Sequence, residues 1–408
     1  MSIKGNCIIA QSGGPTAVIN SSALGVIETA MKSNLIEGVY SAKNGILGVL
    51  NDELFDLRKE DIETIQGLRN TPSSALGSNR YKLKSQEDLE KLFSIFQKHN
   101  IRYFFYIGGN DSMDTADKLN KLAIDKNYEM HVMGVPKTID NDLFGTDHCP
   151  GYGSVIKYMA TMTMEVGRDT EAMYTTDTVS IVESMGRHTG WIAAGTALAK
   201  KTDEDAPHMI LLPEVPFDKE HFKSVLQSYI DKYNRATIVV SEGTKYPDGT
   251  FLGEQKGEFS KDSFGHTQLG GAALSLKSII ENEVKVKARF VIPSLAQRSA
   301  MHFASKTDSD EAYFVGAKAV EFAVTGESGY MTTIQRVSNN PYKTEINKVA
   351  LSEVANSEHL LPKKWISKDG FFVKQEFFNY ALPLIQGEVP IKMEQGLPVF
   401  MRFKKHFI

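Results

Sequence analysis

Short apolar runs recur along the chain, and the best-defined ones end in glycine-rich or polar turns. They include Cys7–Ala10, the aromatic run Ile101–Ile107, and His131–Val135, which stops at Pro136. Uninterrupted runs of aliphatic, β-branched and aromatic residues are typical of strands buried on both faces of a parallel sheet. Further strands of this kind are predicted at Thr178–Ser184, His208–Leu212, Ala236–Val240 and Arg289–Pro293.

Between these strands, apolar residues recur at the spacing of helices that bury one face. Because strands alternate with helices, the pattern predicts an α/β fold with mostly parallel sheets. In a chain of 408 residues this indicates two α/β domains, or one large domain with additions. The helices are predicted at Ala17–Met31, Met113–Ile124, Trp191–Ala199, Leu269–Val284 and Asp310–Thr325.

The pattern changes after Gly326, which marks the end of the last predicted helix. From Tyr330 to Leu351, polar and apolar residues alternate around the turn sequence Ser338-Asn339-Asn340-Pro341. Alternation with a period of two predicts a β-hairpin. The rest of the chain shows no pattern of known site chemistry, and we interpret it as part of an extension.

The composition describes an ordinary globular protein, with 41% hydrophobic and 24% charged residues. A formal net charge of −4 gives no support for a nucleic-acid or membrane-surface role. The two cysteines, Cys7 and Cys149, lack a metal-ligand spacing and suggest no disulfide framework. No window approaches the roughly 18 apolar residues of a membrane span, and the first residues show no signal-peptide pattern. We expect a soluble, cytoplasmic protein.

Two of the predicted strands end in a pair of glycines followed by a helix. The first turn is Gln11–Thr16 (QSGGPT), and the second is Gly108–Ser112 (GGNDS). Backbone N–H groups and the helix dipole converge at such a junction, so the pattern indicates an anion site. Two plainer interpretations stay open: glycines that serve only a tight turn, and Asp111 as a helix N-cap.

The loop Pro136–Asp142 (PKTIDND) places Lys137 beside two carboxylates, Asp140 and Asp142. A cation for phosphate oxygens and a carboxylate that accepts an alcohol proton are the combination that phosphoryl transfer needs. The alternative is a turn in which polar side chains bind local backbone and the lysine is solvated. A loop of small residues, Ser73–Arg80, adds an arginine that could clamp a phosphate.

Seven loop sequences carry more information together than any one of them: QSGGPTAVIN (11–20), GSNR (77–80), GGNDS (108–112), PKTIDND (136–142), MGR (185–187), SEG (241–243) and QRS (297–299). In this order, over roughly residues 7–325, they resemble the bacterial-type phosphofructokinase family and its pyrophosphate-dependent branch. The resemblance implies two Rossmann-like α/β domains whose mostly parallel sheets face each other across a cleft. It assigns residues 1–145 to a domain that binds the phosphoryl donor, and the chain returns to this domain after about residue 295. Residues 146–295 are assigned to a domain that binds the sugar phosphate, and residues 326–408 to a C-terminal extension.

The resemblance also implies a role for each matching residue. Asp140 matches the catalytic base that takes the proton of the sugar's 1-hydroxyl, and Lys137, Asp111 and Arg80 would assist it. Pyrophosphate would be bound by Gly13, Gly14, Arg80 and Lys137. Mg²⁺ would be held by Asn110, Asp111 and Asp142. The sugar phosphate would be bound by Thr138, Ile139, Asp140, Met185, Gly186, Arg187, Glu242, Arg289 and Arg298.

Asp111 stands where family members that use ATP typically have glycine. The resemblance implies that its carboxylate occupies the place of the α-phosphate of ATP, so that ATP is rejected and pyrophosphate fits. It therefore implies reversible phosphoryl transfer from pyrophosphate to the 1-hydroxyl of fructose 6-phosphate. The alternatives are an ATP-dependent 6-phosphofructokinase, a pyrophosphate enzyme that also accepts sedoheptulose 7-phosphate, and a non-enzymatic sugar-phosphate sensor or regulatory subunit.

Three positions depart from the family pattern. Asn110 replaces an aspartate near the metal, Leu295 replaces a tyrosine or histidine that reaches the 6-phosphate, and Thr178 replaces an arginine that crosses a subunit interface. Arg289 matches the companion crossing arginine, so we expect a homo-oligomer, either a dimer or a tetramer. No nucleic-acid or membrane partner is expected.

Overall fold

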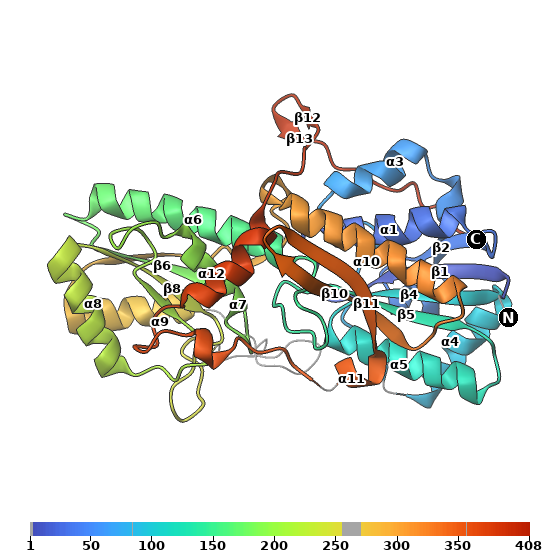
Figure 1. The fold of residues 1–408 in the computed structure, drawn as a ribbon, viewed down its shortest axis with the longest axis horizontal. Coiled ribbons are helices and arrows are strands. Elements are labelled where there is room, and N and C mark those ends of the chain that lie inside the picture. The colour runs from blue at the N-terminus through green and yellow to red at the C-terminus, as the bar shows by residue number, and fades with distance from the viewer. Residues whose placement is uncertain (1–2, 84, 255–270, 356) are drawn as a thin grey trace. The chain divides into compact units, whose positions relative to one another are not determined.

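The structure is a computed structural model that describes residues 3–83, 85–254, 271–355 and 357–408 (Figure 1). The chain forms two compact units. Unit 1 comprises Met1–Tyr152, Arg298–His359 and Gln386–Ile408, and unit 2 comprises Gly153–Gln297 and Leu360–Ile385. The residues after 326 are therefore divided between the two units. None of the described helices is both long and apolar enough to span a bilayer.

Unit 1 is built on a seven-stranded sheet. In spatial order its strands are β11 (Tyr342–Ala350), β10 (Tyr330–Asn339), β5 (His131–Pro136), β4 (Ile101–Gly108), β1 (Gly5–Gln11), β2 (Ile36–Ala42) and β3 (Leu54–Asp56). Neighbouring strands are parallel from β10 to β2, and only the two edge strands, β11 and β3, run antiparallel to their neighbours. The loops that follow β1, β4 and β5 therefore leave the sheet at the same edge.

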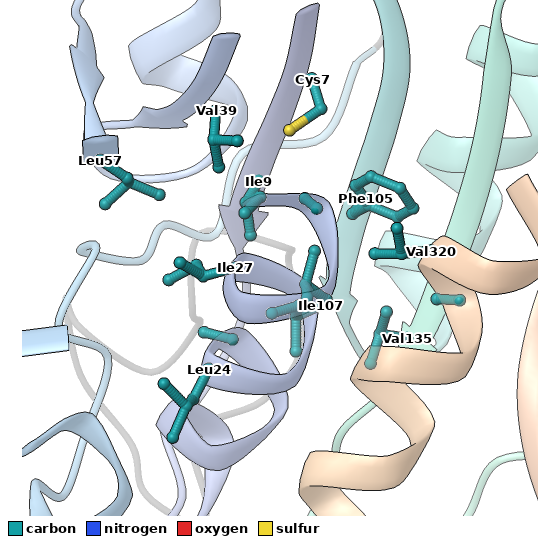
Figure 2. Close-up of a cluster of buried hydrophobic side chains, with 14 of the residues drawn as sticks. Cys7, Ile9, Leu24, Ile27, Val39, Leu57, Phe105, Ile107, Val135 and Val320 are labelled. Atoms are coloured by element: carbon teal, nitrogen blue, oxygen red, sulfur yellow. The ribbon is translucent and has the colours of Figure 1, made fainter. Parts of the chain in front are cut away.

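The central strands of unit 1 are buried on both faces, because successive side chains point to opposite sides of a sheet. Ile9 and Phe105 pack in the cluster on one face (Figure 2), whereas Ile8 and Phe104 pack in the cluster on the other. The helices around this sheet are α1 (Ile19–Lys32), α2 (Ile46–Leu50), α3 (Ile62–Gly67), α4 (Gln86–Lys98), α5 (Asn110–Asp125), α10 (Lys306–Val324) and α11 (Leu351–Val354).

Helices α1 and α10 approach each other so closely that the contact requires glycine (Figure 1). A Cβ on Gly25 would lie 2.0 Å from Tyr313 O, and one on Gly316 would lie 2.1 Å from Ser22 O. Both helices supply residues to the cluster of Figure 2. This contact attaches the part of the chain that returns to unit 1 at Arg298 to the first helix of the same unit.

Unit 2 contains a four-stranded parallel sheet. In spatial order its strands are β7 (Met209–Leu211), β8 (Ala236–Ser241), β6 (Val179–Ser184) and β9 (Ala288–Val291). Every residue of β6 and β8 is buried, which agrees with their central places in the sheet. The helices of this part of the chain are α6 (Tyr152–Met173), α7 (Trp191–Gly195), α8 (Lys219–Tyr233), α9 (Ala272–Ile279) and α12 (Gln375–Ala381). A short hairpin, β12 (Met393–Glu394) with β13 (Leu397–Pro398), lies in the part of the chain that has returned to unit 1.

The predicted α/β fold with mostly parallel sheets is confirmed, and the predicted hairpin forms β10 and β11. Helix α10 begins at Lys306 rather than Asp310, because the Ser305 side chain caps it by accepting from the Asp308 N–H. The helix predicted from Leu269 begins at Ala272, and Leu269 itself lies outside the described residues. The helix predicted at 191–199 is α-helical only to Gly195 and then tightens into a 3₁₀ turn.

Helices α4, α6 and α8 were not predicted from the sequence. In α8 only Phe222 and Leu226 are buried, and in α4 only Leu92, Phe93 and Phe96 are buried. A helix that buries so few side chains gives a weak periodic signal, so α4 and α8 became clear only in the structure.

Candidate active site

The glycine turn after β1 is joined to the loop that carries Arg80. Gly13 has φ +77°, a backbone conformation that favours glycine. Its N–H donates to Asn79 O at 3.0 Å, and its carbonyl accepts from Ser78 Oγ at 2.6 Å. These bonds hold the GSNR loop, which carries Arg80, against the glycine turn of Gly13 and Gly14.

Lys137 comes from the end of β5 and reaches the same turn. Its Nζ donates to Gly14 O at 2.8 Å, and a Cβ on Gly13 would lie 3.1 Å from Nζ. The lysine is 3% exposed. Burial lowers its pKa to about 8, although the Asp140 carboxylate acts in the opposite direction. The alternative of a solvated lysine is wrong.

Arg298 adds a second cation beside the turn. A Cβ on Gly14 would lie 2.8 Å from Nη1 of Arg298, so glycine leaves the room that the guanidinium occupies. The charges of Arg298 and Arg80 both lower the pKa of Lys137, which indicates that the three cations share one region. Such a cluster repels itself, and an anion with several phosphate oxygens would relieve the repulsion.

The loop after β5 places two carboxylates next to this cationic region. Thr138 Oγ1 accepts from the Asp140 N–H at 3.1 Å, and the Asn141 side chain accepts from the Cys149 N–H at 2.9 Å. The interpretation that polar side chains bind local backbone is therefore correct for Thr138, whereas Asn141 binds backbone eight residues further along the chain. Burial raises the pKa of Asp142, and the neighbouring Asp140 charge raises it further.

Asn110 opens α5 beside the same pair. Its Nδ2 lies 3.4 Å from Asp142 Oδ2, and its Oδ1 is buried with no hydrogen-bond partner among the described residues. A buried oxygen next to a carboxylate suits a hard cation such as Mg²⁺, which takes its remaining ligands from water and phosphate. Within the described ranges, no group of three or more His, Cys, Asp or Glu side chains could hold a metal ion. A metal here would therefore depend on the oxygens of a bound donor.

Asp111 lies in the first turn of α5, whose N-cap is Gly109. The interpretation of Asp111 as an N-cap is therefore wrong. Its Oδ1 lies 3.4 Å from Nζ of Lys82, and the two side chains are 44% and 43% exposed. An exposed pair of this kind contributes little stability. The position of the Asp111 carboxylate is consequently set by the helix that carries it.

In unit 2, the loops after β6 and β8 leave the sheet side by side, because the two strands are parallel and paired along their whole length. The Gly186 N–H donates to Glu242 Oε1 at 3.3 Å, and Ser241 Oγ donates to Gly186 O at 2.7 Å. A Cβ on Gly243 would lie 2.2 Å from Arg187 O. Gly186 and Arg187 therefore lie beside the SEG loop, whose middle residue is Glu242.

Arg289 does not join these loops. It pairs with Ser180 near the start of β6, whereas Met185 follows the end of that strand. Its side chain is 62% exposed, and its Nε lies 3.1 Å from Asp177 Oδ1. Because β9 is an edge strand, this arginine is accessible to a neighbouring molecule.

The sequence matches the family model for phosphofructokinase over residues 6–323. The chain belongs to the phosphofructokinase family. It is 45% identical over 407 residues to the pyrophosphate–fructose 6-phosphate 1-phosphotransferase of Halomonas elongata, with 98% of this chain and 96% of the relative covered. The enzyme of the same name from Xanthomonas campestris is 44% identical with the same coverage.

A solved structure agrees with this assignment. The pyrophosphate-dependent phosphofructokinase from Marinobacter aquaeolei matches the whole of this chain and 97% of its own, with a TM-score of 0.91 and 42% sequence identity. The family resemblance and the Rossmann-like fold expected from it are confirmed.

Sequence reasoning missed two polar residues at these sites. Lys82, beside Asp111, follows the GSNR motif, but an isolated lysine in a loop carries no signal of its own. Gln297, within QRS, accepts from the Met185 N–H at 3.1 Å through its side-chain oxygen. The motif directed attention to its arginine, and only the structure shows that the glutamine positions the MGR loop.

Proposed function

We propose that this phosphofructokinase transfers a phosphoryl group reversibly from pyrophosphate to the 1-hydroxyl of fructose 6-phosphate. The observation that carries the proposal is the buried Lys137 ammonium, bound to the first glycine turn and next to the loop of Asp140. The names of the two bacterial relatives and of the solved structure support the same donor and acceptor. The reaction would be reversible because the leaving group is phosphate rather than a nucleotide.

The residues of unit 1 suit the roles that this reaction requires. Asp140 would accept the proton of the 1-hydroxyl as the sugar oxygen attacks the phosphoryl group. Lys137, Arg298 and Arg80 would balance the charge on the phosphoryl oxygens in the transition state. The resemblance assigns Arg298 to the sugar phosphate, but its place against Gly14 supports a role at the transferred group as well.

Mg²⁺ would bind beside the carboxylates of Asp140 and Asp142. The buried Asn110 Oδ1 and the Asp142 carboxylate would hold it, and Asp111 lies in the first turn of the same helix as Asn110. Bound there, the ion would offset the negative charge of pyrophosphate. Asn110 supplies an uncharged oxygen where many relatives have a carboxylate, so the donor would have to contribute more of the binding.

Asp111 would select the donor. Its carboxylate projects from the rigid first turn of α5, where an α-phosphate of ATP would meet a like charge. Pyrophosphate has no third phosphoryl group and no nucleoside, so it would avoid the conflict. Exclusion of the larger donor, rather than an added contact to the smaller one, would set the preference.

The resemblance assigns Thr138, Ile139, the MGR loop and Glu242 to the sugar phosphate. The exposed Arg289 would reach the 6-phosphate in the site of a partner subunit, which makes the proposed enzyme a homo-oligomer. A cytoplasmic location is supported by Cys7 and Cys149, which are both buried and unpaired.

A panel of donors and acceptors tests the proposal directly. The purified protein is assayed with Mg²⁺ and either pyrophosphate or ATP, against fructose 6-phosphate and sedoheptulose 7-phosphate. We expect activity with pyrophosphate and fructose 6-phosphate. Strong activity with ATP and none with pyrophosphate would refute the donor assignment, and activity on the seven-carbon sugar would broaden the acceptor. Sugar-phosphate binding without any turnover would favour the alternative of a non-enzymatic sugar-phosphate sensor.

The variant Asp111→Gly tests the basis of donor choice. Removing the charge and the side chain should raise kcat/KM for ATP about tenfold or more, because tenfold corresponds to only ~1.4 kcal/mol of relieved repulsion. Asp114→Gly is the matched control: it is on the same helix, removes the same side chain and charge, and has a helix-propensity cost of only roughly 0.3 kcal/mol. The control should leave the ratio of ATP to pyrophosphate activity unchanged. An Asp111→Gly enzyme that still rejects ATP would contradict the exclusion argument.

A further inference from the structure

A buried imidazole lies between two carboxylates just beyond the loop of Asp140. His148 is 1% exposed. Its Nδ1 lies 2.8 Å from Asp147 Oδ1, and its Nε2 lies 2.7 Å from Glu311 Oε2. Burial alone would lower the pKa of His148, but the charges and hydrogen bonds of Glu311 and Asp147 outweigh it and raise the pKa to about 9. Both ring nitrogens therefore carry protons at neutral pH and donate to the carboxylates.

The β10–β11 hairpin supplies further partners to both carboxylates. Asp147 Oδ1 accepts from Arg336 Nε at 3.1 Å and from Nη2 at 2.8 Å. Glu311 Oε1 accepts from the Tyr342 hydroxyl at 2.8 Å and from Thr344 Oγ1 at 3.0 Å. The cluster of two anions and two cations is therefore electrically balanced. Its members come from three places: the chain segment after the catalytic loop, helix α10 and the hairpin.

The segment that holds His148 also fixes both sides of Asp140. On one side, the Thr138 N–H donates to Pro150 O at 3.3 Å. On the other, the Cys149 N–H donates to the side chain of Asn141, which has φ +56°. Asparagine tolerates a positive φ better than most non-glycine residues, and this hydrogen bond holds the Asn141 side chain in place there. A shift of residues 147–150 would therefore move the backbone on either side of the catalytic carboxylate.

The backbone of the hairpin also forms hydrogen bonds with the residues just before His148. The Asp147 N–H donates to Ile334 O at 2.8 Å, and the Ile334 N–H donates to Thr146 Oγ1 at 2.9 Å. His359, whose Nδ1 lies 3.1 Å from Asn141 O, and Asp308, whose Oδ1 accepts from the Gly151 N–H at 2.9 Å, are further titratable groups near the segment. The hairpin and the cluster thus connect a C-terminal part of the chain to the loop of Asp140.

We propose that His148 is a positioning residue for Asp140, through which the β10–β11 hairpin sets the catalytic loop. The proposal rests on the phosphoryl-transfer function argued above. It gives a task to residues 330–350, in which the sequence shows a hairpin but no site chemistry. Held by two charge-assisted hydrogen bonds, the imidazolium fixes residues 147–150, and these residues fix Thr138 and Asn141 around Asp140.

The test replaces His148 with glutamine, which is uncharged and cannot donate to both carboxylates at once. We expect kcat with pyrophosphate to fall about 10- to 100-fold, because small displacements of a reacting group have effects of this size. KM for pyrophosphate should change less than about threefold, since Lys137 and the glycine turn are not moved. Tyr342→Phe, which removes one donor to Glu311, should produce a smaller fall in kcat in the same direction.

His208→Gln is the matched control, because His208 is also a buried histidine with one backbone partner, the Thr237 N–H at 2.9 Å. It lies in unit 2 and should lose stability without losing kcat per folded molecule. Hydrogen exchange supplies a readout independent of activity. The backbone amides of Asp140 and Cys149 should exchange faster in His148→Gln than in the parent, and at the parental rate in His208→Gln. A His148→Gln enzyme with kcat within twofold of the parent and unchanged exchange would overturn the inference. If the parent has no pyrophosphate activity, the proposed function fails, and the exchange result still decides the positioning role.

Discussion

Single residues decide the chemistry of this protein through the pairing of buried charges. Lys137 lies almost wholly out of solvent, where a cation is costly, and the carboxylates of Asp140 and Asp142 only partly offset that cost. The bound donor would supply the missing negative charge. The site is therefore unfavourable when empty and favourable when filled by an anion.

This balance predicts a pH dependence. A lysine whose pKa is lowered to about 8 loses its charge as the pH rises through that value, so kcat/KM for pyrophosphate should fall about tenfold per unit above it. The Lys137→Arg enzyme keeps a positive charge at this position over the whole pH range, so its kcat/KM for pyrophosphate should not show this fall. Its overall rate will be lower, because the planar guanidinium differs in shape from an ammonium. Steady-state rates across the neutral to alkaline range measure the effect. The same step in the arginine variant would assign it to another group.

At the scale of elements, the contact between α1 and α10 joins the early and late parts of unit 1. The absence of side chains at Gly25 and Gly316 allows the two backbones to touch. Helical periodicity predicts that each helix has a buried face, but it does not reveal which helix covers that face.

Gly25→Ala should therefore destabilise the protein even though alanine is the better helix former. The new Cβ would meet the backbone of α10, and we expect a loss of about 1–3 kcal/mol, the usual cost of overpacking. Thr29→Ala on the same helix is the control and should be close to neutral. The midpoints of urea unfolding measure the difference. A midpoint for Gly25→Ala equal to or above that of the parent would contradict the close-contact argument.

The hairpin illustrates a similar limit at this scale. Its alternating sequence was sufficient to predict two strands and a turn, and β10 and β11 confirm it. Its partners could not be predicted, because Arg336 and Tyr342 meet Asp147 and Glu311 only through the tertiary structure. Nor does any sequence spacing relate His148 to Glu311, which lie 163 residues apart.

At the scale of the whole molecule, the chain passes between its two units repeatedly, so the candidate site draws on distant segments. Arg298 begins a return to unit 1 and lies against Gly14. Arg289 lies on the exposed edge of the unit 2 sheet, near the start of β6 and not at the end that carries the MGR loop. The proposed function assigns it to the site of a second subunit.

Mixing two inactive variants tests that requirement. Asp140→Asn lacks the base, and Arg289→Ala lacks the arginine that would reach the partner's site. In randomly mixed dimers about half are heterodimers, and each would contain one site with both groups, so about a quarter of the parental activity should return. Activity is measured after the variants are unfolded and refolded together. If the mixture is no more active than the average of the two variants, Arg289 acts within its own chain or not at all.

The sequence by itself determined the α/β fold class, the glycine turns, the acidic loop and the family, because each depends on residues close together in the chain. Apolar runs, helical periodicity and short motifs are local features, and they survive without knowledge of the fold. Only the tertiary structure decided which charged groups lie together: the buried Lys137 beside Arg298, the exposed Asp111 beside Lys82, and the buried His148 beside Glu311. Burial and electrostatic coupling depend on distances in space, and these distances come from the packing of segments that the sequence keeps far apart.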